Sequence, residues 1–213
     1  MKTDDLVSLL ASGAGAVDPG AARRRWSLAL SGGTLVATLL VFAWLEVNPA
    51  LGRDARAPMF WVKEAFCAAL AVGALMAVAR LGRPGAPLGG LRPLLALPVA
   101  ALWMLAAVVL LTADAAERSD LILGISWTEC SVNIALLSMP VFAAMVWLMR
   151  GLAPTRLRLA GAAAGFAAGA MGALVYTLHC PELEAPFLAI WYVLGMLIPA
   201  TLGALVGPRL LRW

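Results

Sequence analysis

Residues 93–113 read PLLALPVAALWMLAAVVLLTA, an uninterrupted apolar run without one charged side chain. A helix needs about 20 mostly apolar residues to cross the hydrocarbon layer of a bilayer. Five further segments have a similar length and composition: 26–47, 59–79, 130–149, 159–178 and 187–206. These runs are rich in Leu and Ala and lack the strict alternation of membrane barrel strands. The sequence therefore predicts an all-α, integral membrane bundle of six transmembrane helices.

The overall composition leads to the same class of protein. Of the 213 residues, 62% are hydrophobic and 13% are charged, whereas a water-soluble domain carries about 25% charged residues. A single core in a chain of this length cannot cover so much apolar surface, so lipid is the expected solvent.

The loops between these segments predict the orientation. Twelve basic residues fall on one side: Lys2, Arg23, Arg24, Arg25, Arg80, Arg83, Arg92, Arg150, Arg156, Arg158, Arg209 and Arg212. The other side holds Arg53, Arg56 and Arg118. Because basic loops stay in the cytoplasm, the pattern predicts a multi-pass protein of a bacterial inner membrane with both termini inside. The net charge of +4 is then a topology signal, and direct nucleic-acid binding is not expected.

Two parts follow from this topology, a cytoplasmic segment (1–25) and a transmembrane domain (26–213). In the first, Asp4 and Asp5 suit the first turn of a short helix, where the helix dipole favours acids. Three leucines fall on one face of that helix: Leu6, Leu9 and Leu10. So short a helix gains order by docking in the groove of a partner. A disordered tail, or one lying on the membrane surface, is the alternative.

Three glycines are spaced four residues apart in segment 159–178, namely Gly161, Gly165 and Gly169. They line one helix face and allow another backbone to approach closely. Packing inside the bundle is the favoured interpretation, and a homodimer seam is the alternative.

Two cysteines are expected at the same membrane depth on the outer side. Cys130 opens one predicted span and Cys180 follows another, and a short inner loop joins the two spans. Antiparallel neighbours of this kind can bring two sulfurs together. A structural disulfide and a redox- or metal-responsive pair both remain open.

Other reactive side chains surround this pair in the sequence: His179, Glu182, Cys67 and Lys63. Thiolate and imidazole ligands suit soft metal ions, so transient heavy-metal binding at Cys130, Cys180 and His179 is conceivable, although no resident cofactor is expected. A buried cysteine is otherwise a small core residue. A lysine inside a span is either functional or snorkels to the interface, and Lys63 fits both descriptions.

The sequence contains no recognisable catalytic constellation. It has no CxxC pair, phosphate-binding loop or HExxH motif, so an enzyme is not expected. A membrane thiol oxidoreductase and a small metal or solute transporter remain as alternatives to a regulator. The missing CxxC argues against the first, and the few polar residues deep in the spans argue against the second.

Several motifs spread along the chain resemble one known family. They are Thr3-Asp4-Asp5-Leu6, Lys63, Ala153-Pro154-Thr155, Tyr176 with His179-Cys180-Pro181, Trp191-Tyr192, and the ending Leu210-Leu211-Arg212-Trp213. Together they resemble the negative-regulator-of-sigma-F (NrsF) family of six-span membrane anti-sigma factors. The resemblance implies an extracytoplasmic-function sigma factor as partner, bound by residues 1–25 and released under metal or oxidative stress. It also implies sensing thiols at Cys130 and Cys180, and it leaves the role of Cys67 open.

Overall fold

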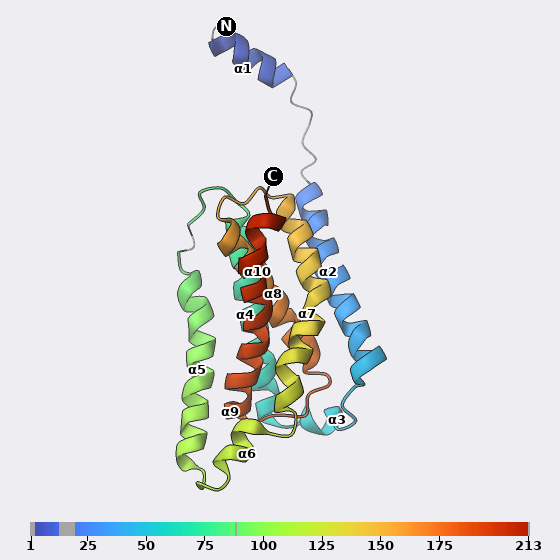
Figure 1. Cartoon of the computed structure of the whole chain (residues 1–213), viewed down its shortest axis with the longest axis vertical. Coiled ribbons are helices and arrows are strands. Elements are labelled where there is room, and N and C mark those ends of the chain that lie inside the picture. The colour runs from blue at the N-terminus through green and yellow to red at the C-terminus, as the bar shows by residue number, and fades with distance from the viewer. Residues whose placement is uncertain (1–2, 13–19, 88, 213) are drawn as a thin grey trace.

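The structure is a computed structural model that describes residues 3–12, 20–87 and 89–212, and helices are its only regular elements there (Figure 1). The elements are α1 (Thr3–Ser12), α2 (Ala21–Leu40), η1 (Val41–Leu45), α3 (Leu51–Asp54), α4 (Pro58–Leu81), α5 (Leu91–Thr112), α6 (Arg118–Leu123), α7 (Trp127–Arg150), α8 (Leu157–Tyr176), α9 (Ala185–Phe187), η2 (Leu188–Tyr192) and α10 (Val193–Leu210). The elements η1 and η2 are π-helical turns that continue into their neighbours.

Six helical stretches are long and apolar enough to cross a membrane, which confirms the predicted all-α bundle of six spans. They are Ala21–Leu45, Pro58–Leu81, Leu91–Thr112, Arg118–Arg150, Leu157–Tyr176 and Ala185–Leu210. The first begins before the three arginines at 23–25, so residues 21–25 of the predicted cytoplasmic segment belong to α2. Residues 1–2 and 13–19 of that segment lie outside the described residues.

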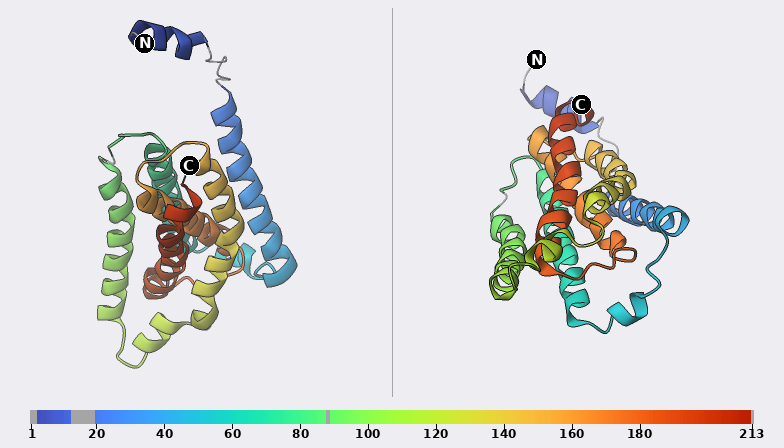
Figure 2. Two further views of the ribbon diagram at one scale, coloured as in Figure 1. Left: turned by 45° about the horizontal axis from the view of Figure 1, so that its top comes forward. Right: turned by 60° about the horizontal axis from the view of Figure 1, so that its bottom comes forward.

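The six spans differ greatly in how deeply the protein buries them. Helix α8 lies at the centre against α4, α7 and α10, and 67% of its apolar window is buried. Helix α5 stands at the edge (Figure 2), and only 11% of its window is buried. Apolar side chains such as Leu97 and Leu111 therefore face outward from α5, as expected for a surface that lipid covers.

Helices α8 and α10 approach each other so closely that glycine is required at the contact. A Cβ atom at Gly161 would collide with the carbonyl of Gly203, and one at Gly165 would collide with that of Pro199. A Cβ atom at Gly169 would lie 2.7 Å from the Met196 carbonyl oxygen. The intramolecular interpretation of this glycine face is confirmed. A homodimer seam at this face is wrong because α10 covers it.

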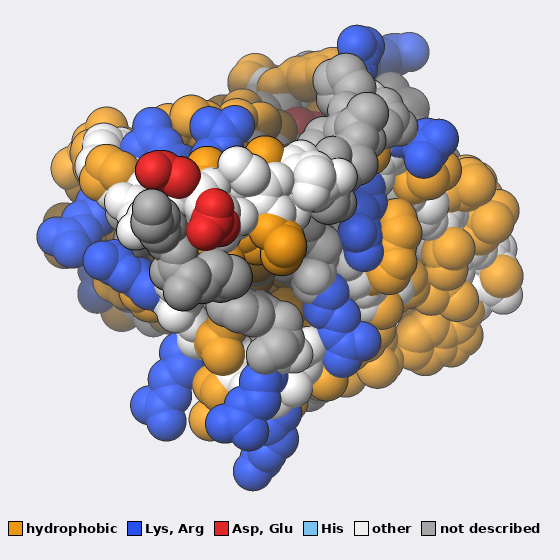
Figure 3. All heavy atoms as spheres, turned by 90° about the horizontal axis from the view of Figure 1, so that it is seen from above, with side chains coloured by type: hydrophobic (Ala, Val, Ile, Leu, Met, Phe, Trp, Pro, Cys, Tyr) orange, Lys and Arg blue, Asp and Glu red, His pale blue; other side chains and the backbone are white. Residues whose placement is uncertain are grey.

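The chain enters and leaves the bundle at one end (Figure 1). Figure 3, seen from that end, shows Lys and Arg side chains gathered around it. We call it the arginine-rich end, and its location in the cytoplasm stays a prediction of the positive-inside rule. The opposite end, called the far end, holds α3, α6 and the loop between α8 and α9.

Candidate functional site

The three cysteines lie toward the far end and are all free thiols buried in the protein. Cys130 is in the first turn of α7, and Cys180 follows the end of α8. The two sulfurs are neighbours, with the Cys130 thiol placed as a donor toward Cys180. The structure thus brings the two predicted sensing thiols together in their reduced form. Their conversion to a disulfide stays a prediction.

Lys63 reaches this thiol pair from the second turn of α4. Its side chain is 1% exposed. Its ammonium donates hydrogen bonds to the carbonyl oxygens of Cys180, at 2.9 Å, and Glu182, at 3.2 Å. The snorkelling alternative is therefore wrong, because the side chain runs into the protein and binds the loop after α8.

Glu182 joins the same loop to the start of α7. Its carboxylate accepts hydrogen bonds from the backbone amides of Ile125, at 2.7 Å, and Ser126, at 3.3 Å. These amides precede α7, and a helix N-terminus favours a nearby negative charge. The preceding residue, Gly124, has φ +56°, and a Cβ atom there would lie 2.8 Å from the carboxylate. Glycine at 124 therefore gives the carboxylate room to reach these amides.

These contacts make residues Cys180–Glu182 the centre of the site, and we call this segment the thiol loop. Its sulfur contacts Cys130, its carbonyls bind Lys63, and its carboxylate caps α7. Helices α4 and α7 are thus connected through a segment that is distant from both in sequence.

The Cys180 sulfur has an electrostatic environment that favours the thiolate. The hydrogen bond from the Cys130 thiol lowers the pKa of Cys180, and so does the charge of Lys63, while burial opposes them. The result is a pKa of about 6 against an ordinary value of 9.0. The thiolate is therefore favoured at Cys180 by its surroundings, while the side chain itself is buried.

His179 turns away from the position predicted for a metal ligand. Its Nδ1 lies 2.9 Å from the carbonyl oxygen of Glu46, and its ring packs on Tyr176. Within the described ranges, no group of three or more His, Cys, Asp or Glu side chains is placed to hold a metal ion. The structure therefore does not assemble His179 with Cys130 and Cys180 into one preformed set. Cys67 is fully buried on α4, one helical turn after Lys63.

Tyr192 belongs to the site but was not singled out as a site residue from the sequence. It is completely buried, and its hydroxyl lies against Cys180. That hydroxyl has no well-formed hydrogen bond among the described residues. In the sequence, the Trp191-Tyr192 pair contributes only to the family resemblance. The signal that could have identified Tyr192 as a site residue is its position near the outer end of a predicted span, at the depth expected for the two cysteines.

The π-helical turn η2, which ends at Tyr192, supplies carbonyl groups to its neighbours. The indole N–H of Trp103 on α5 donates to the Ala189 carbonyl at 3.1 Å. The hydroxyl of Ser131 on α7 donates to the Trp191 carbonyl at 2.8 Å. π-helical turns are frequent at functional sites. Here the turn couples Tyr192 to both α5 and α7.

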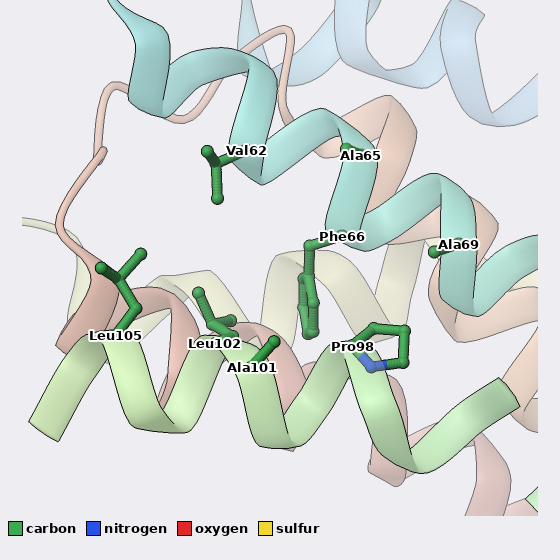
Figure 4. A pocket seen from close by; sticks show the side chains of 8 residues that line it. All are labelled: Val62, Ala65, Phe66, Ala69, Pro98, Ala101, Leu102 and Leu105. Carbon is green, nitrogen blue, oxygen red and sulfur yellow. The ribbon is translucent and has the colours of Figure 1, made fainter. Parts of the chain in front are cut away.

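A cavity of about 350 Å³ lies between α4 and α5 (Figure 4). Its lining side chains are all apolar: Val62, Ala65, Phe66, Ala69, Pro98, Ala101, Leu102 and Leu105. The cavity supplies no acid, base or ion ligand, so it gives no support to the transporter alternative.

Helix α1 carries the predicted partner-binding residues, and none of its residues is buried. Asp4 and Asp5 occupy its first turn. Leu6, Leu9 and Leu10 are 41%, 66% and 64% exposed. The predicted short helix is confirmed, and its leucine face has no cover from the rest of the described chain.

Comparisons with known proteins were made over the whole chain. A family model described as "Negative regulator of sigma F" matches residues 10–213. The chain is 53% identical to a protein of Azospira oryzae named "Probable anti-sigma-F factor NrsF", and the match covers all of both chains. It is 39% identical to the "Anti-sigma-F factor NrsF" of Caulobacter vibrioides, again over the whole of both chains. No solved structure matches the chain.

Proposed function

The chain belongs to the negative-regulator-of-sigma-F family, and from this premise we propose that it holds an extracytoplasmic-function sigma factor inactive at the membrane. The relatives are named as anti-sigma factors, which are regulators of transcription and not enzymes. In this proposal residues 1–25 bind the sigma factor, and the thiol pair at the far end controls its release.

The exposed leucine face of α1 is the observation that carries the binding part of the proposal. Leu6, Leu9 and Leu10 stand on one side of a helix whose residues are all exposed. An amphipathic helix of this kind binds by laying its apolar face in a groove of the partner. Asp4 and Asp5 add negative charge beside that face, which suits a basic groove.

The thiol pair carries the sensing part of the proposal. An oxidant that accepts two electrons would convert the Cys180 thiolate and the Cys130 thiol to a disulfide and release one proton. A soft metal ion would instead bind both sulfurs. Either reaction changes the link between the thiol loop and α7. Lys63, Glu182, Cys67 and His179 are auxiliary residues in this proposal.

The binding part is tested with the full chain in lipid nanodiscs, using an extracytoplasmic-function sigma factor of the same organism as the captured protein. Leu6→Asp with Leu9→Asp is expected to lower capture at least tenfold, since burying two charges in an apolar groove costs more than about 1.4 kcal/mol. The matched control is Ser8→Asp with Ala11→Asp, which adds the same charge to the opposite helix face and is expected to retain capture.

Equal loss in both double variants would mean that charge, and not the leucine face, decides capture. Unchanged capture by the leucine variant would remove α1 as the binding element. If the wild-type chain itself fails to capture the sigma factor, the anti-sigma proposal fails for this partner.

A further inference from the structure

A second pocket lies at the arginine-rich end, where α5 stands apart from the rest of the bundle (Figure 2). Its volume is about 270 Å³. Its walls come from the last two turns of α4, the first two turns of α5, the first half of α8 and one residue of α10. All of its lining residues are apolar except Arg92 on α5. We call this space the Arg92 pocket.

Small side chains on α4 and α8 leave this space open. Ala74 and Ala77 line it from α4, and Ala162 and Ala163 line it from α8. Leu95 of α5 lies close to α4, because a Cβ atom at the neighbouring Gly73 would be 2.8 Å from its side chain. Helix α5 is thus held near α4 at this level, while the alanines on both sides do not fill the remaining volume.

The pocket extends from the protein surface into the bundle. Ala74, Leu81 and Leu91 are buried and belong to its inner part, whereas Leu159 and Arg92 are exposed and belong to its mouth. Protein interiors are packed almost as densely as organic crystals. An apolar space that opens toward the lipid-covered surface of a membrane bundle therefore suits an acyl chain.

The mouth of the pocket is positively charged. Within the described part of the chain, no carboxylate forms an ion pair with Arg92, or with Arg158, which directly precedes Leu159 on α8. The first turns of α5 and α8 contain no acidic residue either. An anion at this position would therefore meet a guanidinium group that no acid of the described chain neutralises.

We propose that the Arg92 pocket binds one anionic phospholipid, with an acyl chain among α4, α5 and α8 and its phosphate on Arg92. The guanidinium group binds phosphate oxygens through paired hydrogen bonds, and basic pockets between transmembrane helices bind anionic headgroups. A zwitterionic lipid also carries a phosphate, but its ammonium group is repelled by Arg92 and Arg158. This site is independent of the thiol pair and of the sigma factor.

The test is native mass spectrometry of the purified full chain in detergent micelles, titrated with equal amounts of phosphatidylglycerol and phosphatidylcholine. The wild type is expected to retain one phosphatidylglycerol, with a preference of about fivefold, the factor that one arginine near an anionic headgroup supplies. Arg92→Gln is expected to remove this preference. Arg23→Gln is the matched control, because Arg23 is an exposed arginine on α2, a helix that does not line the pocket.

A second variant tests the apolar part of the site. Ala163→Leu places a larger side chain in the pocket and is expected to lower retention of both lipids. Ala43→Leu, at an exposed position on η1, is its control and is expected to retain the wild-type adduct. Glycerol phosphate, which has the anionic group without acyl chains, is expected not to displace the bound lipid.

Four outcomes would overturn the proposal. The first is a wild type without preference between the two lipids, and the second is an equal loss of preference in the Arg92 and Arg23 variants, which would assign it to overall charge. The third is unchanged binding in both Arg92→Gln and Ala163→Leu, which would place the lipid elsewhere. The fourth is a dimer that Ala163→Leu dissociates and that carries no lipid, which would make a second copy of the chain the occupant.

Discussion

The carboxylate of Glu182 and the backbone amide of Ile125 are 2.7 Å apart, although 57 positions separate the two residues in the chain. This contact places the thiol loop directly on the N-terminus of α7, the helix that carries Cys130. The site therefore consists of two thiols on segments joined by a charge-assisted hydrogen bond, and the predictions below test its parts.

Glu182→Gln is expected to destabilise the folded chain by about 1–2 kcal/mol, because it removes the charge that caps α7 and weakens its hydrogen bonds. Thermal unfolding in nanodiscs measures the effect, as a lower Tm than that of the wild type. Glu184→Gln is the matched control, since Glu184 is exposed two positions further along the same loop. An equal loss in both variants would contradict the role assigned to Glu182.

Cys130→Ala is expected to slow the reaction of Cys180 with alkylating reagents at pH 7. The Cys130 hydrogen bond is the largest cause of the lowered pKa of Cys180, so its removal returns that pKa toward 9.0. With a pKa of about 6, Cys180 is mostly thiolate at pH 7 and mostly thiol at pH 5. Reactivity of the wild type should thus fall about tenfold or more between pH 7 and pH 5.

Cys67→Ala serves as the control for this measurement, because Cys67 makes no hydrogen bond with Cys180 among the described contacts. In this variant, the pH at which the alkylation rate of Cys180 is half its maximum is expected to match that of the wild type. A midpoint that moves equally in both cysteine variants would show that packing, and not the Cys130 hydrogen bond, governs Cys180.

Gly165→Ala is expected to destabilise the bundle by about 1–3 kcal/mol, because the added methyl group meets the Pro199 carbonyl of α10. Gly32→Ala is the comparison, since a Cβ atom at Gly32 has nothing within 4 Å. Thermal unfolding of both variants in nanodiscs gives the difference. Equal stability of the two would show that α8 and α10 can separate at no cost.

The orientation of the bundle is tested with an impermeant maleimide added to intact cells. Arg53→Cys at the far end should be labelled, and Arg83→Cys at the arginine-rich end should be labelled only after the cells are opened. Both positions are exposed arginines, so the pair differs in side and not in accessibility. Labelling of Arg83→Cys in intact cells would reverse the topology.

Hydrophobicity alone was sufficient to predict the six spans, because each long apolar run can satisfy its backbone groups only as a helix in lipid. The predicted span 93–113 and the observed Leu91–Thr112 differ by one or two residues at each end. The short helices α3 and α6 were not predicted, since loops of that length carry no periodic apolar pattern. The π-helical turns were not predicted either, because one extra residue in a turn leaves no mark in hydrophobicity.

The candidate site could be predicted only in part. Proximity of Cys130 and Cys180 could be predicted because antiparallel neighbouring helices can bring together residues at one membrane depth. The direction of the Lys63 side chain depends on carbonyl groups more than a hundred positions away in the sequence. The local sequence therefore left a functional lysine and a snorkelling lysine equally open. The position of the His179 ring could not be predicted for the same reason, because its partner is the carbonyl of Glu46, on the distant chain segment after η1.

The extra residue in the turn Leu188–Tyr192 also constrains how this protein can evolve. A chain one residue shorter there could form a regular α-helix, but the segment before it would be rotated by about 100° relative to α10. Tyr192 and the thiol loop would then no longer share one side. Substitutions in this turn preserve that geometry, whereas a deletion or an insertion does not. Evolution can therefore replace the side chains of this turn more easily than it can change the number of its residues.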